Sequence, residues 1–120
     1  MVNVQTENHG VNLVIAQIRR DFVASLLQRS LTLEALKLAA AAAQDKDQAV
    51  FEIGAMAHKI AGVAGTLGFD RLSEISLALD TLIGPAGGGN HATPESWTKV
   101  QDLVETLLDE MEALMDQADS

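Results

Sequence analysis

The chain has 120 residues, no cysteine and a formal net charge of −9. This length suffices for one domain with one hydrophobic core. The missing cysteines exclude disulfides and thiolate chemistry, and the acidic balance, with no cluster of Lys and Arg, opposes nucleic-acid binding. No stretch is apolar enough to span a membrane, and the first residues lack a signal-peptide pattern. We therefore expect a single domain, residues 1–120, in the cytoplasm, without nucleic-acid or membrane partners.

Helices dominate the expected structure, because Ala and Leu are frequent, tyrosine is absent and no segment alternates polar and apolar residues. Residues 1–9 show no periodicity and are expected to form a flexible tail. Apolar residues then recur at helical spacing from Val11 to Ala40. This pattern fits one long helix, or a short helix leading into a longer one with a break between Arg20 and Thr32.

Polar and glycine-containing segments divide the rest of the chain into three further helices. The glycine-rich residues 86–92 have no periodicity and predict an exposed loop. The expected helix ends are Asp47 as an N-cap, Gly68 as a C-terminal glycine, Asp70 as an N-cap, Gly84-Pro85 as a stop and Thr93-Pro94 as the last start. Short connections make neighbouring helices antiparallel. The sequence therefore predicts an all-α, antiparallel up-down four-helix bundle with an additional N-terminal helical segment.

The second of these helices carries a histidine, His58, on the side away from its apolar residues. An apolar stripe, expected to face the core, comprises Ile53, Met56, Ala57, Ile60, Val63, Ala64 and Leu67. At about 100° per residue, His58 points about 160° away from the middle of this stripe. Its imidazole is therefore expected to stand in water.

Small residues surround His58 on the helix surface, although a glycine inside a helix costs about 0.5–1 kcal/mol relative to alanine. A flat surface of this kind lets another protein, or another helix of the same chain, approach closely. Because these residues lie opposite the apolar stripe, we favour docking of a partner. The expected docking residues are Phe51, Gly54, Ala55, Ala61 and Gly65.

A lone exposed histidine has limited chemistry. No serine lies in the strand-turn-helix setting of a catalytic triad, and His9, His58 and His91 are scattered without carboxylates at metal-ligand spacing. What remains is the imidazole as a nucleophile, since a solvent-facing histidine is largely neutral at pH 7. Phosphoryl transfer depends mainly on positioning and charge stabilisation, so a partner that carries Mg²⁺ could supply what this chain lacks. No cofactor or metal of its own is expected.

Residues 57–68, AHKIAGVAGTLG, continuing through Leu72 to Leu79-Asp80, closely resemble the signature of histidine-containing phosphotransfer (HPt) domains. The resemblance implies a four-helix bundle that relays a phosphoryl group between aspartates of response-regulator receiver domains. It implies receiver domains and a hybrid histidine kinase as partners, no kinase activity of the chain itself, and Mg²⁺ on the receiver.

The resemblance also assigns roles to individual residues. The phosphorylated histidine falls on His58 and the family's small residue four positions later on Gly62. The usual lysine three residues after the histidine is absent, because Ala61 occupies its place; Lys59 is the nearest candidate for that charge. Asp80 stands where the family often has Glu or Gln, within reach of the imidazole. A carboxylate there would accept the Nδ1 proton and leave Nε2 as the nucleophile.

The expected function is therefore that of a monomeric phosphoryl carrier in a two-component phosphorelay. Two alternatives stay open at this point. The chain could be a docking module that binds receivers without phosphotransfer, as the missing lysine suggests, or a plain structural helical bundle.

Overall fold

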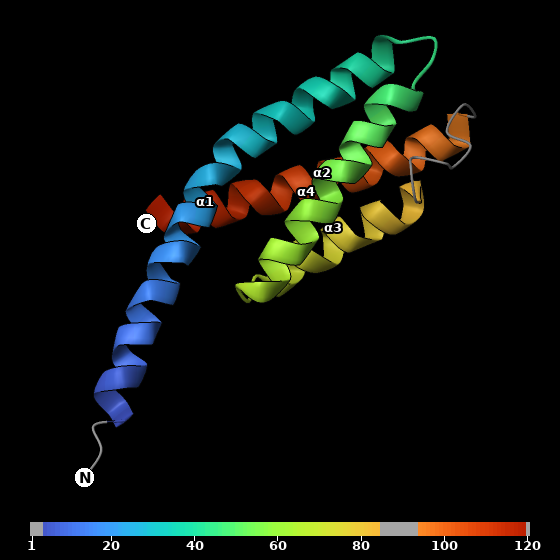
Figure 1. Cartoon of the computed structure of the whole chain (residues 1–120). Coiled ribbons are helices and arrows are strands. Elements are labelled where there is room, and N and C mark those ends of the chain that lie inside the picture. The colour runs from blue at the N-terminus through green and yellow to red at the C-terminus, as the bar shows by residue number, and fades with distance from the viewer. Residues whose placement is uncertain (1–3, 85–93, 120) are drawn as a thin grey trace.

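The computed structural model describes residues 4–84 and 94–119, which form four helices and contain no strand. The helices are α1 (Val4–Ala42), α2 (Asp47–Thr66), α3 (Asp70–Ile83) and α4 (Pro94–Asp119) (Figure 1). The predicted all-α fold is confirmed, and the start at Pro94 agrees with the expected helix start. The expected loop of residues 86–92 and the cap Thr93 lie outside the described residues.

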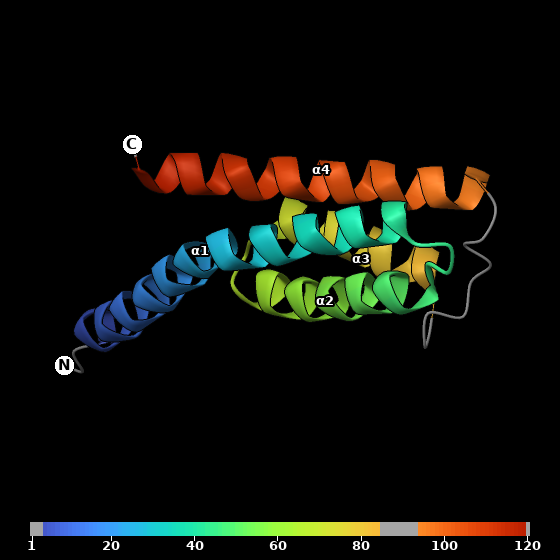
Figure 2. The same cartoon turned by 90° about the horizontal axis from the view of Figure 1, so that it is seen from above.

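The helices form an antiparallel up-down bundle in which each one packs against two others, in the order α1, α2, α3, α4 and back to α1. In Figure 2, α4 runs along the top and α2 along the bottom, with α1 in front of α3 between them. Both views show the N-terminal part of α1 extending past the ends of the other helices (Figures 1 and 2). The longest dimension of the molecule is 66 Å, and a 39-residue helix alone accounts for about 58 Å of it.

Helix α1 is uninterrupted, so of the two expected alternatives the single long helix is the correct one, with no break between Arg20 and Thr32. It also starts earlier than predicted: the segment expected to be a tail is helical from Val4 onward. One apolar stripe runs along the helix, but only its C-terminal part, from Phe22, is buried in the bundle. Val11, Ile15 and Ile18 continue the stripe and are exposed. They form the additional N-terminal segment, here called the α1 arm, which is part of α1 and not a separate helix.

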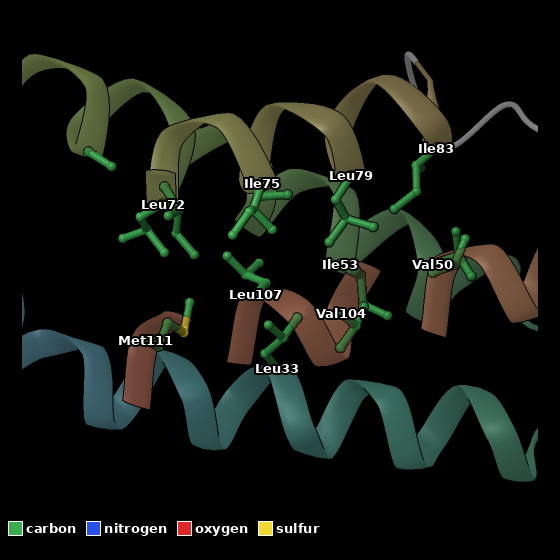
Figure 3. Close-up of a cluster of buried hydrophobic side chains, with 14 of the residues drawn as sticks. Leu33, Val50, Ile53, Leu72, Ile75, Leu79, Ile83, Val104, Leu107 and Met111 are labelled. Carbon is green, nitrogen blue, oxygen red and sulfur yellow. The ribbon is translucent and has the colours of Figure 1, made fainter. Parts of the chain in front are cut away.

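The core is made of aliphatic side chains from all four helices. Figure 3 shows them converging between the α2–α3 pair and the α1–α4 pair. Residues with almost no exposed surface include Leu33, Ile53, Leu72, Leu79, Val104, Leu107 and Met111. Burial of each such side chain contributes about 1.5–3 kcal/mol. This core fixes the rotation of α2 about its axis and thereby decides which of its residues face solvent.

The connection from α2 to α3 is short and well anchored. Gly68 has φ of +82°, as a C-terminal glycine requires. The guanidinium of Arg19 donates a hydrogen bond to the Leu67 carbonyl at 2.5 Å and lies 4.5 Å from the centre of the Phe69 ring. A cation at this position also suits the negative end of the α2 dipole. Arg19 therefore attaches α1 to the end of the helix that carries His58.

The two aspartates expected as N-caps do not cap their helices. Asp47 and Asp70 are each the first residue of a helix, following Lys46 and Phe69. The Asp47 N–H donates to the carboxylate of Asp45 at 3.0 Å. An N-cap residue precedes the first helical residue, so each aspartate lies one position too late to be the cap. Both acids are still in the first turn of a helix, where negative charge is favourable.

Candidate functional site

His58 stands on the surface of α2 with 77% of its side chain exposed, as the sequence predicts. Its Nδ1 lies 3.0 Å from Oδ2 of Asp80 on α3. The Asp80 side chain is only 27% exposed, because it lies near the end of α3 against α2. The structure thus brings the two residues into hydrogen-bond contact through Nδ1, and Nε2 is the ring nitrogen that does not take part in this contact.

Close packing of α2 on α3 sets the distance between these two side chains. A Cβ added to Gly54 would lie 3.0 Å from Cγ2 of Ile83, and one added to Gly65 would lie 3.1 Å from Oγ of Ser73. The Ser73 hydroxyl also donates to the carbonyl of Ala61 at 2.9 Å. Small residues on α2 are therefore needed for the approach of α3.

This finding corrects part of the expected docking surface. Gly54 is buried, Gly65 is exposed but closely approached by Ser73, and the Ala61 carbonyl accepts from Ser73, so these three residues lie at the contact with α3. The remaining expected docking residues, Phe51 and Ala55, are exposed on the face that carries His58. Gly62 also belongs to this face, because a Cβ there would have no atom within 4 Å.

We expect opposite effects from alanine at two of these glycines. Gly62→Ala should raise the free energy of unfolding by about 0.5–1 kcal/mol, since alanine is the better helix former and the site is open. Gly54→Ala should lower it by about 1 kcal/mol, because the new methyl group displaces Ile83 in the core. Urea denaturation followed by circular dichroism measures both. Equal stabilisation by the two changes would contradict the packing role of Gly54.

The buried face of α2 is rotated about the helix axis relative to the predicted core face. Val63, predicted to face the core, is 41% exposed. It helps to line an open hollow of about 750 Å³ between α1 and α2. This His58 hollow is lined by Ile18 and Arg29 of α1 and by His58, Lys59, Gly62, Val63, Thr66 and Leu67 of α2. Its walls are mainly apolar, with the imidazole and two cationic side chains among them.

Arg29 is the charged residue of this hollow that sequence reasoning did not assign to the site. It lies on α1, 29 residues before His58 in the chain, and nothing in the local pattern connects the two. Lys59, expected as a source of positive charge, does line the hollow. Only the antiparallel pairing of α1 with α2 brings Arg29 to the same place.

Within residues 4–84 and 94–119, no group of three or more His, Cys, Asp or Glu side chains is placed to hold a metal ion. In the same part of the chain, none of the helices combines the length and the apolar character needed to cross a bilayer. What the site offers is an exposed imidazole, a carboxylate on one ring nitrogen and a cationic, mainly apolar hollow beside it.

Comparison with known proteins decides the family. The family model described as Hpt domain matches residues 17–117, which is most of the chain. The chain belongs to the Hpt family. Its resemblance to HPt domains, first visible around His58, is thereby confirmed over the whole bundle. No curated protein and no solved structure gives a significant match.

Membership in the Hpt family carries a general function. Hpt domains act in histidine phosphotransfer within phosphorelays and interact with receiver domains and kinases of two-component systems. The matched segment begins at Gln17 and so contains both His58 and Asp80 but not most of the α1 arm. The arm is therefore an extension beyond the part of the chain that defines the family.

Proposed function

We propose that this Hpt protein relays a phosphoryl group between the aspartates of receiver domains through His58. The contact between His58 Nδ1 and Asp80 is the observation that carries the proposal. It gives an exposed imidazole a defined orientation, which a structural histidine would not need. The two residues belong to one chain, so a single copy contains the complete site.

In this proposal the Asp80 carboxylate accepts the Nδ1–H of a neutral His58, and Nε2 keeps its lone pair. Nε2 attacks the phosphorus of a receiver acyl phosphate. The P–O bond to the receiver aspartate breaks and a P–N bond forms, while the aspartate leaves as a carboxylate. The ring becomes a phosphoimidazolium that keeps its Nδ1 proton, and the adjacent Asp80 stabilises this positive charge. Transfer to the next receiver reverses these steps.

The receiver is proposed to dock on the exposed face of α2 and into the His58 hollow. Phe51 is 45% exposed and offers an aromatic side chain to a partner on the face that carries His58. Gly62 leaves room beside the imidazole for the receiver's aspartate and its Mg²⁺. Mg²⁺ is a cofactor of the receiver in this proposal, and the Hpt chain itself needs no metal or nucleotide.

The decisive experiment is incubation of the purified protein with a phosphorylated receiver. We expect label on this chain that is lost in acid and stable in base, as phosphohistidine is, and no label from ATP alone. A docking module without phosphotransfer would bind the receiver and stay unlabelled. A plain structural bundle would do neither, so binding and labelling together separate the proposal from both alternatives.

Asp80→Asn should slow phosphotransfer about tenfold while leaving the fold intact. Asparagine keeps the size of the side chain but loses the charge that stabilises the phosphorylated ring. Stopped reactions with a phosphorylated receiver measure the rate, and thermal unfolding controls for stability. As a matched control, Asp70→Asn changes an exposed carboxylate on the same helix. Equal rates for both variants would remove Asp80 from the mechanism.

A further inference from the structure

We infer that Arg29 is a catalytic residue that binds the transferring phosphoryl group beside His58. This inference rests on the proposed phosphotransfer through His58 and identifies the cation that acts there. A phosphoryl group in transfer spreads negative charge over its oxygens, and the surrounding groups must stabilise that charge. The chain has a net charge of −9, yet Arg29 places a cation in the hollow beside His58.

The pairing of α1 with α2 puts Arg29 at the level of His58. At one end of the pair Arg19 bonds to the Leu67 carbonyl, and at the other end the turn after Ala42 leads into Asp47. Antiparallel helices rise equally per residue, so Arg29 lies opposite about residues 57–60 of α2. Both Arg29 and His58 line the His58 hollow.

Contacts within α1 hold the Arg29 side chain in place. Its Nε donates to Oγ of Ser25 at 3.1 Å, and its guanidinium carbon lies 5.6 Å from the centre of the Phe22 ring. The Ser25 hydroxyl in turn donates to the carbonyl of Phe22 at 2.6 Å. Arg29 is therefore half-buried and positioned before any ligand arrives.

Apart from its contact with the Phe22 ring, the positive charge of Arg29 has no carboxylate partner in the described part of the chain. Lys37 and Arg71, by contrast, each pair with a glutamate. Its Nε is the nitrogen that bonds to Ser25, which leaves the two terminal nitrogens to bind a ligand. A guanidinium can contact two phosphoryl oxygens at once. Lys59 also lines the hollow but is exposed, and holding its flexible side chain in one place costs more entropy.

The test compares Arg29→Gln, Arg29→Lys and Lys59→Gln in transfer from a phosphorylated receiver, over a range of receiver concentrations. Arg20→Gln serves as control, since Arg20 is an exposed arginine of α1 that does not line the hollow. We expect Arg29→Gln to lower the maximal rate about 10- to 100-fold with little change in the receiver concentration at half-maximal rate. Arg29→Lys should recover part of the rate, and Arg20→Gln should behave as the wild type. Circular dichroism melting verifies that each variant is folded.

Two outcomes would overturn the role of Arg29. One is an unchanged maximal rate in Arg29→Gln with a loss in Lys59→Gln, which would assign the charge to Lys59. The other is a change only in the half-maximal receiver concentration, which would make Arg29 a docking residue. In both cases the wild type still becomes phosphorylated on His58. Failure of the wild type to accept any label would instead contradict the proposed function.

Discussion

His58→Gln should abolish phosphoryl acceptance while leaving the fold and its stability nearly unchanged. Glutamine has no ring nitrogen to attack phosphorus, so the expected loss is complete and not a change of rate. The side chain is 77% exposed and contacts Asp80, so its removal should cost no more than about 1 kcal/mol. Labelling by a phosphorylated receiver and thermal unfolding measure the two effects.

The other two histidines provide matched controls for this experiment. His9→Gln and His91→Gln remove an imidazole from sites that the proposal does not use, and both variants should be labelled as fast as the wild type. Phosphate retained by His58→Gln would contradict the assignment of the nucleophile. Loss of helical signal in the same variant would show instead that His58 supports the bundle.

Gly62→Gln should give a more stable protein that is nearly inactive in phosphotransfer. Gly62 is exposed in the interior of α2, and a Cβ there meets no other atom within 4 Å. Replacing glycine by a good helix former should therefore add about 0.5–1 kcal/mol to the free energy of unfolding. The glutamine side chain would also stand one turn from His58, where the receiver must bring its aspartate. A misplacement of about 1 Å can cost about a hundredfold in rate.

Gly62→Ala separates the two effects of this substitution. It should gain similar stability, and its single methyl group should reduce the rate much less than glutamine does. Urea denaturation and transfer rates for both variants measure stability and activity side by side. A normal rate in Gly62→Gln would place the docking face elsewhere, and a destabilised Gly62→Gln would mean that this face of α2 packs inside the protein.

The number and type of the helices were predictable because long amphipathic segments separated by glycine and polar turns leave little choice. The choice between one long helix and two could not be made for α1, and the tail before it was predicted wrongly, since the apolar stripe of α1 continues through Ile15 and Ile18 without being buried. Periodicity shows that a helix has an apolar face. It does not show where the neighbouring helices end, and here α1 extends past them.

The rotation of α2 was predicted only approximately, for a physical reason. The core face of α2 was predicted from its apolar side chains, and glycines, which have none, do not contribute to such a prediction. The predicted face was therefore centred too close to Val63 and too far from Gly54 and Gly65, where α3 approaches. The same small residues were then assigned to a docking surface. A glycine in the middle of a helix can serve either purpose, and only the position of the neighbouring helix distinguishes them.

The residues around His58 differed in how far they could be predicted. Asp80 was proposed from the resemblance to HPt domains, and the structure places it 3.0 Å from the imidazole. Its role in transfer remains a prediction. Arg29 could not be proposed as a site residue, because its position near His58 depends on how α1 and α2 are aligned along their axes. No local pattern encodes that alignment.

The three-residue connection between α2 and α3 also affects how the site forms during folding. His58 and Asp80 lie on the two helices of one helical hairpin, α2 and α3, 22 residues apart in the chain. Closing so short a loop costs little chain entropy, and local contacts form early in helical proteins. The pairing of imidazole and carboxylate therefore joins two neighbouring segments of the chain, whereas the hollow beside it requires the more distant α1 to dock.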